Sequence, residues 1–395
     1  MSDHDSRIVL GAYDDEAIHP TDNNWTRHSV YRIDRDLKNR TEVPLPYMIW
    51  SLNGKDKLVI DREQNVLLAV SNNDILSPYG KVIKIDRAGK IHDLYTTRNH
   101  LLPPVIGKKQ RIYVAEAYSI NNDKGLYFYC LDAHGLLLWE KSFSCDHIAS
   151  IPVLDAHGNI YIVTDDSEGI FTLHALTNQG EEKWHWSHQG ENRVEPFFGR
   201  DGSIYYATNG DISKISMDGQ SEWEKSFNSM IGPPSMDING RISFESEGYL
   251  YVLSAEGDFI HKIEVDGLFG GSYPLSLTND IFLCEVNRCK LIALDVRTKK
   301  ILWEYQSKGF QADVFPIVDS AGHIIYTTRE IHPKSYVNVI SKDGEKLGEY
   351  EIDGIVLSAV LGADNLLHIL SQVRVRRSRK KDELPYGTKL ITLRS

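Results

Sequence analysis

Polar side chains able to bind a ligand or transfer protons recur in front of short proline-containing segments. Aligned on the proline, these segments read NHLLPP, HIASIP, ENRVEP, NSMIGPP, GGSYP and QADVFP. The side chains they supply are His100, His147, Arg193, Glu195, Tyr273 and Asp313. Imidazole, guanidinium, carboxylate and phenol groups that converge on one cavity suit a polar ligand or general acid–base catalysis. We interpret the six as one candidate ligand-binding site; the alternative is a set of polar side chains solvated by trapped water.

A second set with a clear chemical character is the basic segment VRVRRSRKKDE near the C-terminus. Its six positive side chains are Arg374, Arg376, Arg377, Arg379, Lys380 and Lys381, in a chain with a formal net charge of -11. Such a cluster can bind a phosphate, a carboxylate-bearing ligand or an acidic partner surface. The alternative is the tip of a flexible, solvated hairpin.

Other chemistries lack the residues that they require. The cysteines Cys130, Cys145, Cys284 and Cys289 do not form the CxxC pairs of a zinc site and are too few for a disulfide framework. The Asp/Gly turns lack the ligand ladder of a calcium loop, and no nucleophile elbow, glycine-rich phosphate loop or HExxH motif is present. The sequence therefore predicts no metal site and no cofactor. Its acidic net charge argues against general nucleic-acid binding.

The elements that position these side chains repeat along the chain. The segment KLIALDVRTKKILW, which ends at Trp303, has the pattern of a strand, a polar turn and a second strand. It recurs as YFYCLDAHGLLLW, LHALTNQGEEKW and SKISMDGQSEW, which end at Trp139, Trp184 and Trp223. The apolar residue before each turn recurs every 38 to 53 residues, at Ile33, Ile85, Leu131, Leu176, Ile215, Leu253, Leu294, Ile340 and Leu393. One structural unit is therefore used many times.

Each unit also contains a second strand pair with its own turn, as in IPVLDAHGNIYIV and VFPIVDSAGHIIYTT. Four short strands per unit of this length are typical of a β-propeller. We predict an all-β chain that forms a single β-propeller domain over residues 1–395, with eight four-stranded blades. Residues 57–352 supply seven full blades, and strands in residues 1–56 and 353–395 close the ring as a composite blade. RIVLGAY and KLITLRS offer more strands than that blade needs.

The pattern from Ala293 to Trp303, and again from Leu131 to Trp139, resembles the ALDxxTGxxxW repeat of the pyrroloquinoline-quinone (PQQ) propellers. That superfamily includes quinoprotein alcohol dehydrogenases and the noncatalytic lipoprotein of the outer-membrane β-barrel assembly machine. The resemblance implies that the repeated tryptophans pack between blades. The enzymes of the family pair two adjacent cysteines beside the quinone and bind calcium with clustered Glu, Asn and Asp. This chain has no adjacent cysteines, so we expect no quinone redox chemistry.

One face of the propeller is expected to carry the longer loops. With strands lettered A to D from the axis outward, the B to C connections predicted to be long are 14–28, 72–79, 118–124, 329–334 and 373–385. They belong to neighbouring blades and to the face on which the six candidate ligand-binding residues lie. Binding residues usually sit on loops held by a rigid scaffold, so this sector is the candidate interaction surface. The alternative is that these loops became longer without acquiring a function. Trp25 is expected in the first of these loops, where it could stack on a ligand.

Two functions remain open from the sequence. The first is a binding or assembly module that docks a protein partner or a polar small molecule on the loop-rich face. The alternative is a nonredox enzyme of the lyase, isomerase or cyclase type, with its site at the channel mouth. No apolar run is long enough to span a membrane and the first residues do not resemble a secretory signal, so we expect a cytoplasmic monomer. A periplasmic or secreted location is expected if a leader was removed.

Overall fold

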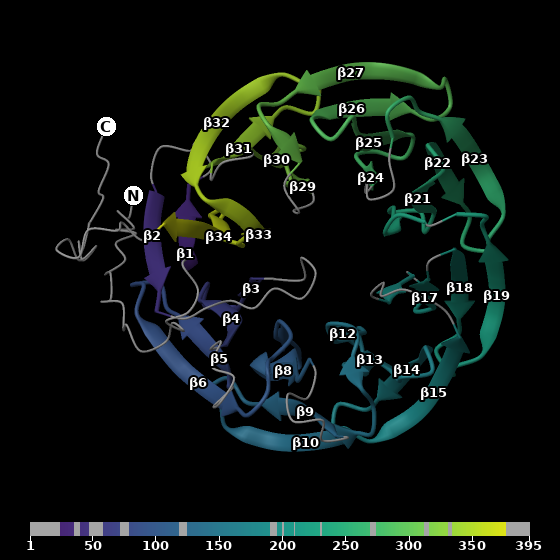
Figure 1. Cartoon of the computed structure of the whole chain (residues 1–395). Coiled ribbons are helices and arrows are strands. Elements are labelled where there is room, and N and C mark those ends of the chain that lie inside the picture. Colours follow the sequence, from purple (N-terminus) through teal and green to yellow (C-terminus); the bar gives the residue numbers. More distant parts are fainter. Residues whose placement is uncertain are drawn as a thin grey trace.

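Short antiparallel strands joined by tight turns make up the computed structural model of the chain (Figure 1). The structure describes residues 24–34, 40–46, 58–71, 79–117, 125–189, 196–199, 201–208, 210–229, 231–268, 274–311, 316–330 and 334–376. Within these residues, no helix has the length and apolar character needed to cross a membrane. The one helical element described is the 3-10 turn η2 (Lys108–Gln110).

Eight antiparallel sheets stand around a central axis as the blades of a propeller, which confirms the predicted fold (Figure 1). From the axis outward, their strands are: blade 1, β3 (Val59–Ile60), β4 (Val66–Ser71), β5 (Gly80–Ile85) and β6 (Ile91–Thr97); blade 2, β7 (Val105–Ile106), β8 (Ile112–Ala115), β9 (Leu126–Leu131) and β10 (Leu137–Phe143); blade 3, β11 (His147–Ile148) with β12 (Val153–Leu154), β13 (Ile160–Asp165), β14 (Ile170–Leu176) and β15 (Glu182–Gln189); blade 4, β16 (Phe197–Phe198), β17 (Ile204–Ala207), β18 (Asp211–Ile215) and β19 (Ser221–Ser226). The others are: blade 5, β20 (Ser235–Met236), β21 (Ile242–Ser246), β22 (Tyr249–Leu253) and β23 (Phe259–Glu264); blade 6, β24 (Leu275–Ser276), β25 (Ile281–Val286), β26 (Lys290–Asp295) and β27 (Lys300–Gln306); blade 7, β28 (Phe310–Gln311) with β29 (Ile317–Val318), β30 (Ile324–Arg329), β31 (Lys334–Ile340) and β32 (Lys346–Asp353); and the composite blade, β33 (Ile355–Leu361), β34 (Leu367–Arg376), β1 (Asn24–Ile33) and β2 (Arg40–Leu45).

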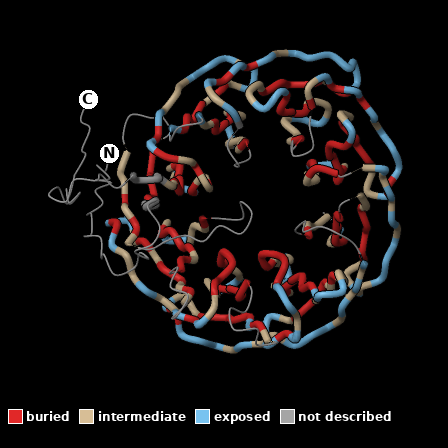
Figure 2. The backbone as a smooth tube through the Cα atoms, viewed as in Figure 1, coloured by how far each residue is buried: buried red, intermediate tan, exposed pale blue. Residues whose placement is uncertain are grey.

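Burial follows the position of a strand within its blade. Strands β13 and β17 are buried along their whole length, because the neighbouring blades cover both faces of each sheet. The outermost strand β15 instead alternates between exposed and half-buried residues, since only one of its faces meets the next blade. Figure 2 shows this gradient, with buried residues in the middle strands and exposed residues around the rim.

The repeated tryptophans lie between blades, as the repeat predicted. The indole Nε1 of Trp303 donates a hydrogen bond of 2.9 Å to the carbonyl of Lys342 in the next blade. Trp184 donates one of 2.8 Å to Met217 in the same way. A glycine of the neighbouring turn faces each ring, and a Cβ added to Gly344 would lie only 2.7 Å from Trp303. The tryptophan of one blade and the turn glycine of the next therefore form a repeated contact.

Strands from both ends of the chain close the ring. β34 pairs with β1 in an antiparallel ladder, so that two C-terminal strands form the inner half of the composite blade and two N-terminal strands the outer half. The buried guanidinium of Arg32 in β1 donates hydrogen bonds to the carbonyls of Asp86 (3.0 Å) and Arg87 (2.8 Å) in blade 1. The extra strands expected from RIVLGAY and KLITLRS, and the marker Leu393, lie outside the described residues.

Candidate functional site

The two faces of the ring differ in their connections. The short-turn face carries the A to B and C to D turns, such as the turn from Asp155 to Asn159. There the carboxylate of Asp155 accepts backbone N–H groups of His157 and Asn159, both at 2.8 Å, and Gly158 adopts a φ of 90°. These contacts confirm that the Asp/Gly motif is a simple turn. The opposite, loop-rich face carries the B to C and D to A connections.

Two of the six predicted channel-mouth residues are described, and the structure brings them into one region of the loop-rich face. His147 begins β11, and its Nδ1 lies 3.0 Å from Oδ1 of Asp165, its partner across the ladder in β13. The imidazole is 46% exposed, whereas the Asp165 carboxylate is buried. His100 is buried, and this desolvation lowers its pKa. Its carbonyl accepts the N–H of Ala117, whose own carbonyl accepts the N–H of Ile148 beside His147.

These contacts create a histidine–carboxylate pair that is open to solvent, and the backbone of Ala117 links its segment to the segment that carries the buried His100. The sequence pattern predicted both histidines as site residues but did not indicate the carboxylate. Asp165 ends an apolar strand, and only the strand register places it opposite His147. The remaining predicted members of this site lie outside the described residues: Arg193, Glu195, Tyr273 and Asp313.

The basic segment begins in a strand, which corrects the predicted loop boundaries. Arg374 and Arg376 belong to β34, where they pair with Thr26 and Asn24 of β1. Trp25, predicted in a loop, lies in β1 opposite Val375. The pairing of two chain ends more than 300 residues apart replaces the expected loop. The other four basic residues lie outside the described part of the chain: Arg377, Arg379, Lys380 and Lys381.

The composite blade therefore carries a protruding two-stranded ribbon. Its inner neighbour β33 pairs with β34 only as far as Gln372, and its outer neighbour β2 pairs with β1 only from His28. Residues 24–27 of β1 and 373–376 of β34 continue beyond both neighbours toward the loop-rich face. We call these two segments the basic ribbon.

The longest B to C connections belong to blades 1 and 2, the two blades that follow the composite blade. In blade 1 the connection runs from Ser71 to Gly80, and in blade 2 from Ala115 to Leu126. Glu116 secures the start of the second one: its carboxylate accepts the hydroxyl of Tyr129 (2.9 Å) and the N–H of Tyr127 (3.0 Å). The prediction of a long B to C connection in blade 7 was wrong. Only residues 330–333 join β30 to β31, and this connection is as short as residues 166–169 in blade 3.

A cavity that was not predicted from the sequence opens on the short-turn face. It has a volume of about 660 Å³ and lies at the axis between blades 1, 2 and 3 and the composite blade. Its wall is apolar at Ile60, Ile106 and Leu361, and its rim carries Arg62 and Gln110, which are joined by a hydrogen bond of 3.0 Å. Such a space can hold a small polar molecule. No sequence signal identified it, because its lining comes from four separate blades.

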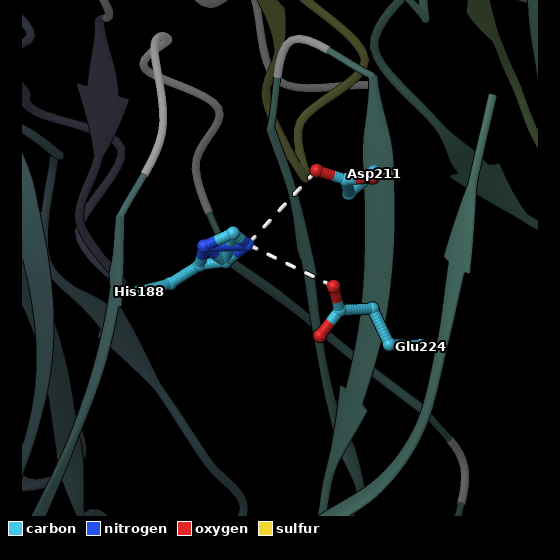
Figure 3. Close-up of side chains that lie close together, drawn as sticks. All are labelled: His188, Asp211 and Glu224. Atoms are coloured by element: carbon cyan, nitrogen blue, oxygen red, sulfur yellow. Dashed lines mark ion pairs between the residues drawn. The ribbon is translucent and has the colours of Figure 1, made fainter. Parts of the chain in front are cut away.

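A cluster of possible metal ligands lies elsewhere, between blades 3 and 4. It consists of His188, Asp211 and Glu224 (Figure 3), whereas the sequence predicted no metal site. The three residues come from strands of two blades, so their spacing in the chain has no metal-binding signature.

No protein-family model and no curated protein sequence matches the chain. Similar solved structures include BamB from Moraxella catarrhalis, with a TM-score of 0.56 and 13% identity over 85% of this chain and 98% of that one. The C-terminal WD40 domain of Sif2 has a TM-score of 0.57 and 11% identity over 82% and 96% of the two chains. A europium-containing methanol dehydrogenase has a TM-score of 0.56 and 10% identity over 81% and 83%. At these identities the likeness shows the fold alone: an eight-bladed β-propeller similar in architecture to PQQ-like and to WD40 propellers.

Proposed function

We propose that this propeller is a binding or assembly module that docks an acidic segment of a protein partner on its loop-rich face. The observation that carries the proposal is the basic ribbon, which extends β34 and β1 past the other two strands of their blade. The proposal needs no quinone chemistry, consistent with the lack of adjacent cysteines in a chain whose repeat resembles that of the PQQ propellers.

The ribbon offers backbone groups to a partner strand. Among the described residues, no strand pairs with β34 beyond Gln372 or with β1 before His28 on the outer edges of the ribbon. A sheet edge of this kind can accept an extended peptide through main-chain hydrogen bonds.

The charge of the ribbon indicates the chemistry of the partner. Arg374 and Arg376 lie on the ribbon itself, and the sequence continues with four more basic residues. The whole chain carries a net charge of -11, so the rest of the chain has an excess of negative charge. An acidic partner would therefore be steered to the ribbon and repelled by the rest of the surface.

The first prediction tests this docking with a fluorescein-labelled poly-glutamate peptide. We expect the wild-type protein to bind the peptide, with affinity that falls as salt is raised. The double variant Arg374→Glu and Arg376→Glu should bind at least about tenfold more weakly, because two attractive charges become repulsive. Fluorescence anisotropy at two salt concentrations measures both effects.

The matched control is Lys299→Glu and Lys300→Glu on blade 6, an exposed pair away from the ribbon. It makes the same change in net charge and should leave binding unchanged. Equal losses in both double variants would reduce the effect to net charge and contradict a docking site at the ribbon.

The pair of His147 and Asp165 favours the second candidate, a nonredox enzyme. A solvent-open imidazole oriented by a buried carboxylate can accept or donate a proton. The second prediction uses thermal stabilisation by a panel of polar carboxylates and sugar phosphates. A compound that stabilises the wild type but neither His147→Ala nor Asp165→Asn would support this candidate. If no compound separates the wild type from these variants, the ribbon remains the only supported interaction site.

A further inference from the structure

Three potential ligand groups converge where blade 3 meets blade 4, on the loop-rich side of the ring. His188 lies near the end of β15, the outermost strand of blade 3. Asp211 begins β18 and Glu224 lies in β19, the two outer strands of blade 4. Figure 3 shows the imidazole from one blade pointing between the two carboxylates from the other.

The register of the strands explains this convergence. Asp211 pairs with Ser226, and Ser213 pairs with Glu224, so Asp211 and Glu224 lie on the same face of blade 4 as diagonal neighbours. On β15, alternate residues face that blade. Trp186, two residues before His188, packs against Tyr206 of blade 4 with ring centroids 6.0 Å apart. His188 is the next residue on the same face of β15.

A backbone contact defines the tautomer of His188. Its Nδ1 lies 2.8 Å from the carbonyl oxygen of Gln189. A carbonyl can only accept, so Nδ1 carries the proton and, in the neutral ring, Nε2 presents a lone pair. This is the arrangement of a metal-ligating histidine, whose second nitrogen donates to a backbone or carboxylate oxygen.

The Nε2 atom is buried and has no hydrogen-bond partner. The nearest carboxylate atoms are Oε1 of Glu224 at 3.9 Å and Oδ2 of Asp211 at 4.0 Å, both beyond hydrogen-bond range. A lone pair that faces two carboxylates is unfavourable unless a positive charge lies between them. The space between Nε2 and the two carboxylates is therefore electrostatically suited to a cation.

The separations suit a single metal ion. Ligand atoms that each lie about 2.1 Å from one tetrahedrally coordinated ion are about 3.4 Å apart. The two distances from Nε2 are slightly longer than this, and all three ligand atoms lie within 4.8 Å of one another, so a small inward movement of the side chains would complete the coordination. The Glu224 side chain is 46% exposed and can move to close the remaining gap. The hydroxyl of Thr208 donates to Oδ2 of Asp211 at 3.3 Å and holds that carboxylate in place.

We propose that His188, Asp211 and Glu224 form a site for a divalent transition metal such as Zn²⁺ or Mn²⁺. One imidazole and two carboxylates suit these ions better than Mg²⁺ or Ca²⁺, which prefer oxygen ligands alone. Two carboxylates neutralise the charge of the ion, and three protein ligands leave coordination positions for water. The ion would join blades 3 and 4 at the loop-rich face, away from the basic ribbon.

The third prediction is tested by isothermal titration calorimetry, which measures the binding of Zn²⁺, and separately of Mn²⁺, to chelator-treated full-length protein. We expect one equivalent to bind to the wild type. His188→Gln and Asp211→Asn should each weaken binding at least about tenfold, a loss of about 1.4 kcal/mol or more. Co²⁺ gives a second readout, because its visible absorption reports the ligands and should be lost in the same variants.

His185→Gln is the matched control. His185 lies on the same strand three residues earlier, but its ring is 61% exposed and contacts Glu182 instead. This variant should bind the ion as the wild type does. If His188→Gln fails to fold by circular dichroism, Glu224→Gln decides the question, because that side chain is half-exposed.

Failure of the wild type to bind either ion would overturn the proposal. So would equal binding by the wild type, His188→Gln and Glu224→Gln. The cluster would then be an ion pair in which a protonated His188 faces the two carboxylates. Neither result affects the proposed docking function, which depends on the composite blade.

Discussion

At the residue scale, the contact between a tryptophan and the glycine of the next blade explains why the repeat keeps both residue types. The glycine has a positive φ, 87° at Gly344, and it faces the ring of Trp303 too closely to allow a side chain. The same arrangement occurs at Gly219 beside Trp184. Four of the contacts between neighbouring blades therefore combine an indole ring packed on a glycine with one indole hydrogen bond.

The fourth prediction separates the effect of the positive φ on stability from the effect of the contact with the tryptophan ring. Gly344→Ala should destabilise the fold by about 2 to 4 kcal/mol, from the strained φ and from overlap of the new methyl group with Trp303. Gly240→Ala is the control, because Gly240 has a φ of 80° but a Cβ there would meet nothing within 4 Å. It should cost only about 1 kcal/mol. Urea unfolding measures both; equal losses would show that the tryptophan contact has no effect on stability.

At the element scale, β34 is the inner strand on which ring closure depends, and it contains a fully buried histidine. His368 pairs with Arg32 of β1 and with Val360 of β33. Its two ring nitrogens have no hydrogen-bond partner. Burial, with a further contribution from the Arg32 guanidinium, lowers the pKa of His368 to about 4 from its usual 6.5. The composite blade therefore tolerates this side chain only in its neutral form.

The fifth prediction concerns the pH dependence of stability. The contribution of neutral His368 is fully present above pH 6.5 and is lost as the pH falls toward 4, because the unfolded chain binds the proton first. Between pH 7 and pH 4.5 it should amount to about 2 to 3 kcal/mol. Denaturant unfolding of wild type and His368→Leu at both pH values measures the difference.

The variant should lose less stability on acidification than the wild type by this amount. His134→Gln, which changes an exposed turn histidine, is the control and should follow the wild type. Identical acid sensitivity in the wild type and His368→Leu would show that His368 does not titrate in this range.

At the scale of the whole molecule, ring closure determines where the candidate interaction surface lies. The composite blade brings two chain ends together, and the two longest B to C connections belong to the blades that follow it. The loop-rich face is therefore uneven: one sector carries the basic ribbon and long connections, while blades 4 to 6 have short ones. The proposed metal site lies outside that sector, where it would reinforce the contact between blades 3 and 4.

The sequence by itself determined the strands, the turns and the number of blades. These features depend on local patterns: alternating apolar residues, Asp/Gly turns and a tryptophan eight or nine residues after a marker such as Leu294. The prediction of a composite blade followed from counting these repeated units along the chain. Local patterns also placed His100 and His147 in equivalent segments before the innermost strands of blades 2 and 3, and the backbone of Ala117 links these segments.

Only the tertiary structure decided which distant residues meet. Trp25 and Arg376 were expected in loops, because the ladder that makes their segments strands joins the two ends of the chain. Asp165 beside His147, the axial cavity and the cluster around His188 were likewise invisible in the sequence. Their residues come from different strands or blades, and the register between strands and the contact between blades, rather than spacing along the chain, bring such groups together.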